Sequence, residues 1–94
     1  MTISFAKRVS VPADVMIQEV AGEAVLLNLK SEQYFGLDDM GTCMWRSLLN
    51  APTIQATYDR LLTEFDVDAD QLRCDLNALI ENLVAHGLVE VAAD

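Results

Sequence analysis

The stretch that decides the fold is residues 15–37, which read VMIQEVAGEAVLLNLKSEQYFGL. It contains three apolar or alternating runs, Val15–Val20, Ala24–Leu29 and Gln33–Leu37, and a few turn residues separate each run from the next. Short runs of this kind, bounded by turn residues, are typical of β-strands. Two tight connections in succession predict an antiparallel meander, because parallel neighbours need a long crossover.

After Leu37 the spacing of the apolar residues becomes helical. They recur every three or four positions in three segments, each beginning near a residue that can cap a helix. The predicted helices run from Asp38 or Asp39 to about Asn50, from the cap Thr53 to about Phe65, and from the acidic turn 66–70 to His86, with Gly87 as C-terminal cap. Residues 89–91 are a short strand or an ordered tail. The sequence predicts an α+β fold, a three-stranded antiparallel sheet followed by three helices.

Composition bounds the class of protein. The 94 residues, 52% of them hydrophobic and 22% charged, are typical of one globular domain with a modest core. Acidic residues number 15 and basic ones 6, so the formal net charge is -9. This balance disfavours nucleic acid and anionic membranes as partners, because both are bound through Lys and Arg. No apolar run approaches the roughly 20 residues that cross a bilayer, and the start of the chain lacks the order of a signal peptide, so we expect a cytoplasmic protein.

Side chains that could carry catalysis are few and scattered. His86, the one histidine, falls in the last turn of the predicted third helix, where it suits the helix C-terminus better than catalysis. Cys43 and Cys74 lie far apart without a C-x-x-C pair, so we expect free thiols and no zinc. The alternating aspartates at 66–70 lack the glycine of a calcium loop, since position 71 is Gln71. The sequence predicts no catalytic site, no metal and no cofactor.

Binding is the remaining class of function. The run Gln33–Leu37 is predicted to be an edge strand, whose free amides and carbonyls are available to another chain. Strand alternation predicts that only one of Tyr34 and Phe35 points inward. The competing interpretation is that these aromatics and the helix stripes simply fill the core.

The order of these segments resembles the PqqD-like family. The pieces that carry the resemblance are Val25–Leu29, Tyr34–Asp38, Gly41, Trp45–Leu49, Thr53–Ile54, Tyr58–Leu61, Val67–Asp68, Asp75, Leu83 and Gly87–Val89. They extend over about residues 12–91 of a single domain, 1–94, and specificity comes from their number and order. The resemblance implies a winged helix-turn-helix-like fold without enzymatic activity. It also implies binding to the leader segment of a ribosomally made precursor peptide, which adds as a strand to the third strand and packs on the third helix.

Within the family, the Tyr34–Asp38 stretch is most similar to the stand-alone proteins of lasso-peptide clusters. This implies that the chain presents the leader to a leader peptidase and a macrolactam-forming cyclase. One alternative is a peptide chaperone for pyrroloquinoline quinone biosynthesis, although those proteins usually have a Pro-Glu turn where this chain has Lys30-Ser31-Glu32. The other alternative is a winged-helix DNA-binding regulator, which the single basic residue of the third helix, Arg73, disfavours.

The predicted peptide site has a strand half and a helix half. Carried over from the resemblance, these are Gln33, Tyr34, Phe35 and Gly36 on the strand, and Arg73, Leu76, Asn77, Ile80 and Val84 on the helix. The predicted core stripe of the helix is Leu72, Leu76, Leu79 and Leu83, so that Ile80 is expected to line the groove and stay open to water. Arg73 is a candidate anchor for an acidic leader residue, or a solvated arginine paired with Asp70 or Asn77.

Overall fold

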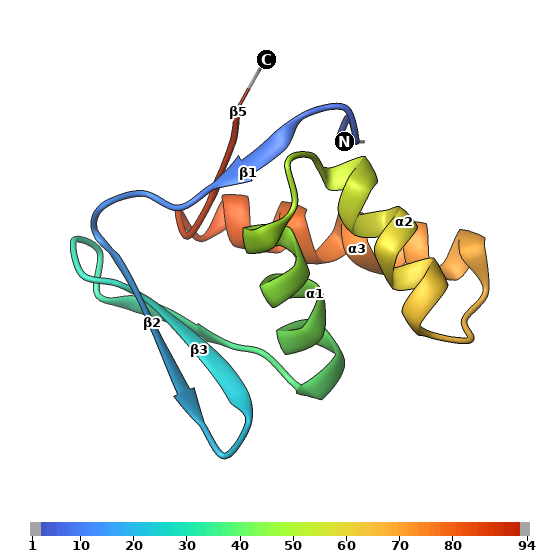
Figure 1. The fold of residues 1–94 in the computed structure, drawn as a ribbon. Coiled ribbons are helices and arrows are strands. Elements are labelled where there is room, and N and C mark those ends of the chain that lie inside the picture. Colours follow the sequence, from blue (N-terminus) through green and yellow to red (C-terminus); the bar gives the residue numbers. More distant parts are fainter. Residues whose placement is uncertain (1–2, 93–94) are drawn as a thin grey trace.

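The computed structural model describes residues 3–92 and contains a meander, three helices and a small terminal sheet (Figure 1). The elements in order are β1 Arg8–Ser10, β2 Val15–Val20, β3 Glu23–Asn28, β4 Gln33–Gly36, α1 Asp39–Asn50, α2 Ile54–Glu64, α3 Ala69–Ala85 and β5 Glu90–Ala92. One antiparallel sheet has the order β2-β3-β4, and a second pairs β1 with β5. The predicted α+β fold is confirmed, and the strand bounds of the meander agree to within one residue.

Two different turns build the meander. The first is the two-residue connection Ala21-Gly22, whose φ values of 55 and 84° match the hairpin turn that follows the right-handed twist of the strands. The second turn is organised by Asn28, whose Oδ1 accepts hydrogen bonds from the backbone N–H groups of Lys30 and Ser31 at 2.9 and 3.1 Å. Its Nδ2 donates to the carbonyl of Gly87 at 2.9 Å. Asn28 therefore ties this turn to the end of α3.

Replacing Asn28 by alanine is expected to destabilise the domain by about 1 to 3 kcal/mol, because three partly solvated hydrogen bonds are lost. Asn28→Asp keeps the acceptor for the turn and loses only the bond to Gly87, so it should cost less. Urea unfolding curves of both variants check this order. Equal losses for the two would show that the bond to Gly87 alone matters.

Each helix begins at a side chain that accepts a hydrogen bond from the first turn. Asp38 accepts from the N–H of Gly41, Thr53 from that of Ala56, and Asp68 from that of Gln71. The N-terminal segment contributes as well, because the carbonyls of Lys7 and Phe5 accept from the N–H groups of Ile54 and Gln55 at 2.9 and 2.7 Å. Residues 3–11 are thus attached to the start of α2.

The core consists of two neighbouring clusters of buried side chains. The helical cluster contains Phe5, Met44, Leu48, Ile54, Tyr58, Leu61, Leu72, Leu76 and Ile80. The sheet cluster contains Ala24, Leu26, Leu37, Trp45, Leu83, Leu88 and Val89. Two features lay outside the sequence predictions: Phe5 is buried in the core, and β1 pairs with β5. The core therefore extends N-terminal to residue 12.

Candidate peptide-binding edge and groove

Strand β4 has an open edge. Within residues 3–92 it pairs with β3 alone. The N–H of Leu37 donates to the carbonyl of Ala24 at 2.8 Å just beyond the strand, which marks Ala24 and Leu37 as a hydrogen-bonded pair. Bonded and non-bonded pairs alternate in an antiparallel ladder, so the polar groups of Phe35 face β3. Those of Tyr34 and Gly36 face the open edge.

The two aromatics of β4 lie on opposite faces of the sheet. Tyr34 is opposite Leu27 on the outer face and is 73% exposed. Phe35 is opposite Leu26 on the inner face, where it is half-buried against the sheet cluster. The prediction that only one of the pair points inward is confirmed. The half-buried Phe35 therefore leaves part of its ring exposed on the inner face of the sheet.

One flank of α3 faces the inner side of β4. The ring of His86 lies 5.3 Å from that of Phe35, centroid to centroid, and Leu79 is half-buried and packs on both core clusters. The Nδ1 of His86 is 2.7 Å from the carbonyl oxygen of Asn82. Steps of three and four residues place Leu79, Asn82 and His86 along one stripe of the helix. We use the name β4–α3 groove for the surface between this stripe and the inner face of β4.

Two residues of the predicted helix half belong to the core: this confirms the place of Leu76 in the core stripe, and the expectation that Ile80 stays open to water is wrong. Leu76 and Ile80 are both 0% exposed and lie in the helical cluster. Leu79, predicted to be one of the four residues of the core stripe, is instead only half-buried. The physical reason is the N-terminal segment: Phe5 joins the helical cluster and Ile3 packs against it, so this cluster extends over Ile80.

Arg73 and Asn77 hold the same N-terminal segment. The guanidinium of Arg73 lies over the rings of Phe5 and Tyr58, 4.6 and 4.8 Å from their centroids. The Oδ1 of Asn77 accepts a hydrogen bond from the N–H of Ile3 at 3.0 Å. Both side chains therefore lie on the flank of α3 away from Phe35.

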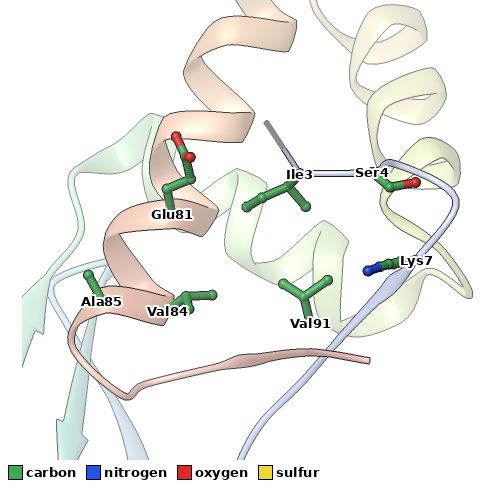
Figure 2. Close-up of a pocket in the computed structure, with 7 residues that line it drawn as sticks. All are labelled: Ile3, Ser4, Lys7, Glu81, Val84, Ala85 and Val91. Carbon is green, nitrogen blue, oxygen red and sulfur yellow. The ribbon is translucent and has the colours of Figure 1, made fainter. Parts of the chain in front are cut away.

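Val84 lines a separate pocket on that flank (Figure 2). The pocket has a volume of about 400 Å³ and is lined by Ile3, Ser4, Lys7, Glu81, Val84, Ala85 and Val91. Figure 2 shows Val84 and Val91 directed into it from α3 and β5. The structure thus brings Gln33, Tyr34, Phe35 and Gly36 together on one edge, but it places Arg73, Asn77 and Val84 on the other side of α3 from the β4–α3 groove.

The sequence prediction placed none of Leu79, Asn82 and His86 in the helix half of the site. The sequence did hold a signal: the apolar residues Ile3, Phe5 and Val9 precede the first predicted strand and must be buried against some surface. If they cover one flank of the third helix, the other flank, with Leu79, Asn82 and His86, is the one left open. His86 does occupy the predicted place at the C-terminal end of the helix, where its backbone N–H also donates to the carbonyl of Asn82. Among the helices of residues 3–92, none combines the length and the hydropathy needed to cross a membrane.

Comparisons with known proteins identify the family of the chain and proteins of similar fold. Residues 23–89 match the family of coenzyme PQQ synthesis protein D (PqqD). Among solved structures, the chain is similar to "TbiB1 in Complex with the TbiA(beta) Leader Peptide", with a TM-score of 0.79 and 30% identity over 89% of this chain and 98% of that one. It is also similar in fold to "Lasso peptide synthetase B1 complexed with the leader peptide", with a TM-score of 0.79 and 20% identity over 88% of this chain and 98% of that one. No curated protein sequence gave a significant match. The family match covers most of the chain, including the meander's last two strands and all three helices, and the chain therefore belongs to the PqqD family.

Proposed function

We propose that this chain recognises the leader segment of a ribosomally synthesised precursor peptide and presents it to modifying enzymes. The observation that carries the proposal is the open edge of β4 beside the half-buried Phe35 and the flank of α3. A leader strand would pair with the outward polar groups of Tyr34 and Gly36, and its inward side chains would enter the β4–α3 groove. The similarity to TbiB1, which was solved with a leader peptide, supports leader binding.

The helix half of the proposed site is Leu79, Asn82 and His86. The strand half is unchanged from the sequence prediction: Gln33, Tyr34, Phe35 and Gly36. In this arrangement Arg73 and Asn77 hold the N-terminal segment, and Leu76 and Ile80 support the helix from the core. We propose no catalytic residue in this site, and we propose that the chain acts as a binding module in the cytoplasm.

The finer proposal is a lasso-peptide pathway, in which a leader peptidase and a macrolactam-forming cyclase receive the bound precursor. It rests on the Tyr34–Asp38 stretch. The family match favours a second candidate, a peptide chaperone for pyrroloquinoline quinone biosynthesis. A DNA-binding regulator is disfavoured, because Arg73, the one basic residue of α3, is engaged with two aromatic rings.

A titration tests the proposed function. The probe is a fluorescein-labelled synthetic peptide that covers the N-terminal part of a short open reading frame sought beside the gene of this chain, and the control is the same composition in scrambled order. We expect anisotropy to report saturable binding of the leader and none of the scrambled peptide. Binding of genomic DNA in a gel shift without binding of the leader would overturn the proposal. A peptidase or cyclase that processes the precursor faster in the presence of the chain would support the lasso pathway.

The two flanks of α3 can be separated by a matched pair of variants. Asn82 and Val84 are both exposed in the last turns of the helix, one on each flank. Asn82→Arg places a long side chain in the β4–α3 groove and should lower leader affinity at least tenfold, about 1.4 kcal/mol. Val84→Arg adds the same side chain on the other flank and should change the affinity less than twofold. The reverse order in the anisotropy titration would return the site to the flank of Arg73 and Val84.

A further inference from the structure

Carboxylates bracket the open strand of the β4–α3 groove. Glu32 directly precedes β4, Leu37 separates the end of the strand from Asp38 and Asp39, and all three carboxylates are exposed. Asp38 uses one oxygen to cap α1 but keeps its charge. The nearest basic residue along the chain is Lys30, in the turn before the strand. Exposed carboxylates therefore lie near both ends of β4, with Lys30 close to Glu32 at the first end and no basic residue close to Asp38 and Asp39 in sequence.

The helix wall of the groove continues this pattern. Asp75 lies one turn before Leu79 on the stripe that also holds Asn82 and His86. It is exposed, and its Oδ1 accepts a hydrogen bond from Nε2 of Gln71 at 2.8 Å, a neutral donor that leaves the charge in place. The stripe itself carries no lysine or arginine.

His86 adds a hydrogen-bond acceptor to the same wall. Its Nδ1 is 2.7 Å from the carbonyl oxygen of Asn82, and because a carbonyl can only accept, Nδ1 carries the proton. In the neutral ring Nε2 is then an acceptor, and within residues 3–92 no group donates to it. The groove thus combines two half-buried apolar residues, Phe35 and Leu79, with the carboxylate of Asp75 on the helix and those near the ends of β4.

We infer that the groove selects leader segments in which a lysine or arginine neighbours an apolar anchor. The anchor covers Phe35 and Leu79, while the basic side chain reaches Asp75 on the helix or the carboxylates at the ends of β4. This inference rests on the proposed function and names the substrate class of that site. An anchor at Arg73 would instead select leader segments with an acidic residue. A single exposed ion pair contributes little to the free energy of binding. The selectivity for basic residues is therefore shared among Asp75 and the carboxylates near the ends of β4.

Selection from a random library tests the inference without a known precursor. Peptides are selected on the wild-type chain from a phage-displayed library of random 16-residue peptides. Each selected peptide is then tested on the Tyr34→Pro variant, which lacks an outward N–H of β4. Peptides that no longer bind this variant are classed as β4-dependent. We expect the β4-dependent peptides to be enriched in Lys and Arg, at a constant spacing from an apolar residue, relative to the input library.

Two charge reversals supply the matched measurement. Asp75 and Asp59 are both exposed, and each accepts a hydrogen bond from a glutamine four residues earlier, at 2.8 and 2.9 Å. Asp75→Lys should lower the affinity for a selected peptide at least fivefold, whereas Asp59→Lys, on α2, should lower it less than twofold. A peptide in which the basic residue is replaced by Glu should prefer Asp75→Lys over the wild type. Circular dichroism confirms that both variants are folded.

The outcomes separate the inference from the proposed function. If β4-dependent peptides show no enrichment in basic residues, or if the two reversals have equal effects, the inference is wrong and the peptide site stands. If no selected peptide depends on β4, the proposed site itself is wrong and the inference falls with it.

Discussion

Replacing Ile80 by glutamate is expected to unfold the domain. Ile80 is 0% exposed and lies among Phe5, Leu76 and the other members of the helical cluster. The substitution removes a large aliphatic side chain and buries a carboxylate without a partner, which together cost about 5 kcal/mol or more. The whole stability of a domain of this size is of the order of 5 to 15 kcal/mol. Emission from Trp45, the single tryptophan and 1% exposed, provides the measurement in a thermal or urea melt.

The control for this prediction is Val84→Glu. Val84 lies four residues further along the same helix and is 42% exposed. A carboxylate there reaches water, so the midpoint of unfolding should shift by only a few degrees. If Ile80→Glu melted like the wild type, the burial of Ile80 and with it the placement of the N-terminal segment would be wrong.

The parts of the fold that local chemistry determines could be predicted from the sequence. The meander followed from the period of the apolar residues, because a half-buried strand shows its two faces alternately. The helix starts followed from side chains that bind amides only a few residues away: Asp38 and Thr53 both cap as expected. The open edge of β4 followed from chain order, since the last strand of a meander has one neighbour.

The helix half of the site could not be predicted in the same way. An apolar stripe on α3 shows that one side of the helix is buried, but the wall that covers each flank comes from elsewhere in the chain. Here Phe5 and Ile3 pack on the flank of Ile80, which sequence spacing had left open. A rotation of about one residue, 100°, separates Leu79 from Ile80 on the helix. Because of this single step, the sequence prediction placed Leu79 in the core and Ile80 at the water-exposed flank, whereas Ile80 is buried and Leu79 is half-buried.

Replacing Tyr34 by proline is expected to abolish most leader binding while the domain stays folded. The N–H of Tyr34 faces the open edge, as the bonded pair of Ala24 and Leu37 requires. Proline removes that N–H, and edge strands tolerate proline where the amide faces solvent. The leader would lose one backbone hydrogen bond and would bury a carbonyl without a donor. Together these cost about 2 to 4 kcal/mol, which corresponds to an affinity loss of roughly 30-fold or more.

Tyr34→Ala isolates the backbone contribution, because it removes the same aromatic ring and keeps the N–H. The ring is 73% exposed on the outer face, away from the β4–α3 groove, so alanine should lower the affinity less than about fivefold. Anisotropy titrations of both variants with the labelled leader, beside thermal melts, provide the measurement. Equal losses for Tyr34→Pro and Tyr34→Ala would mean that the ring is recognised and the strand edge is not. Strand addition on β4 requires the proline variant to be much the weaker of the two, since only proline removes a group that a paired strand must use.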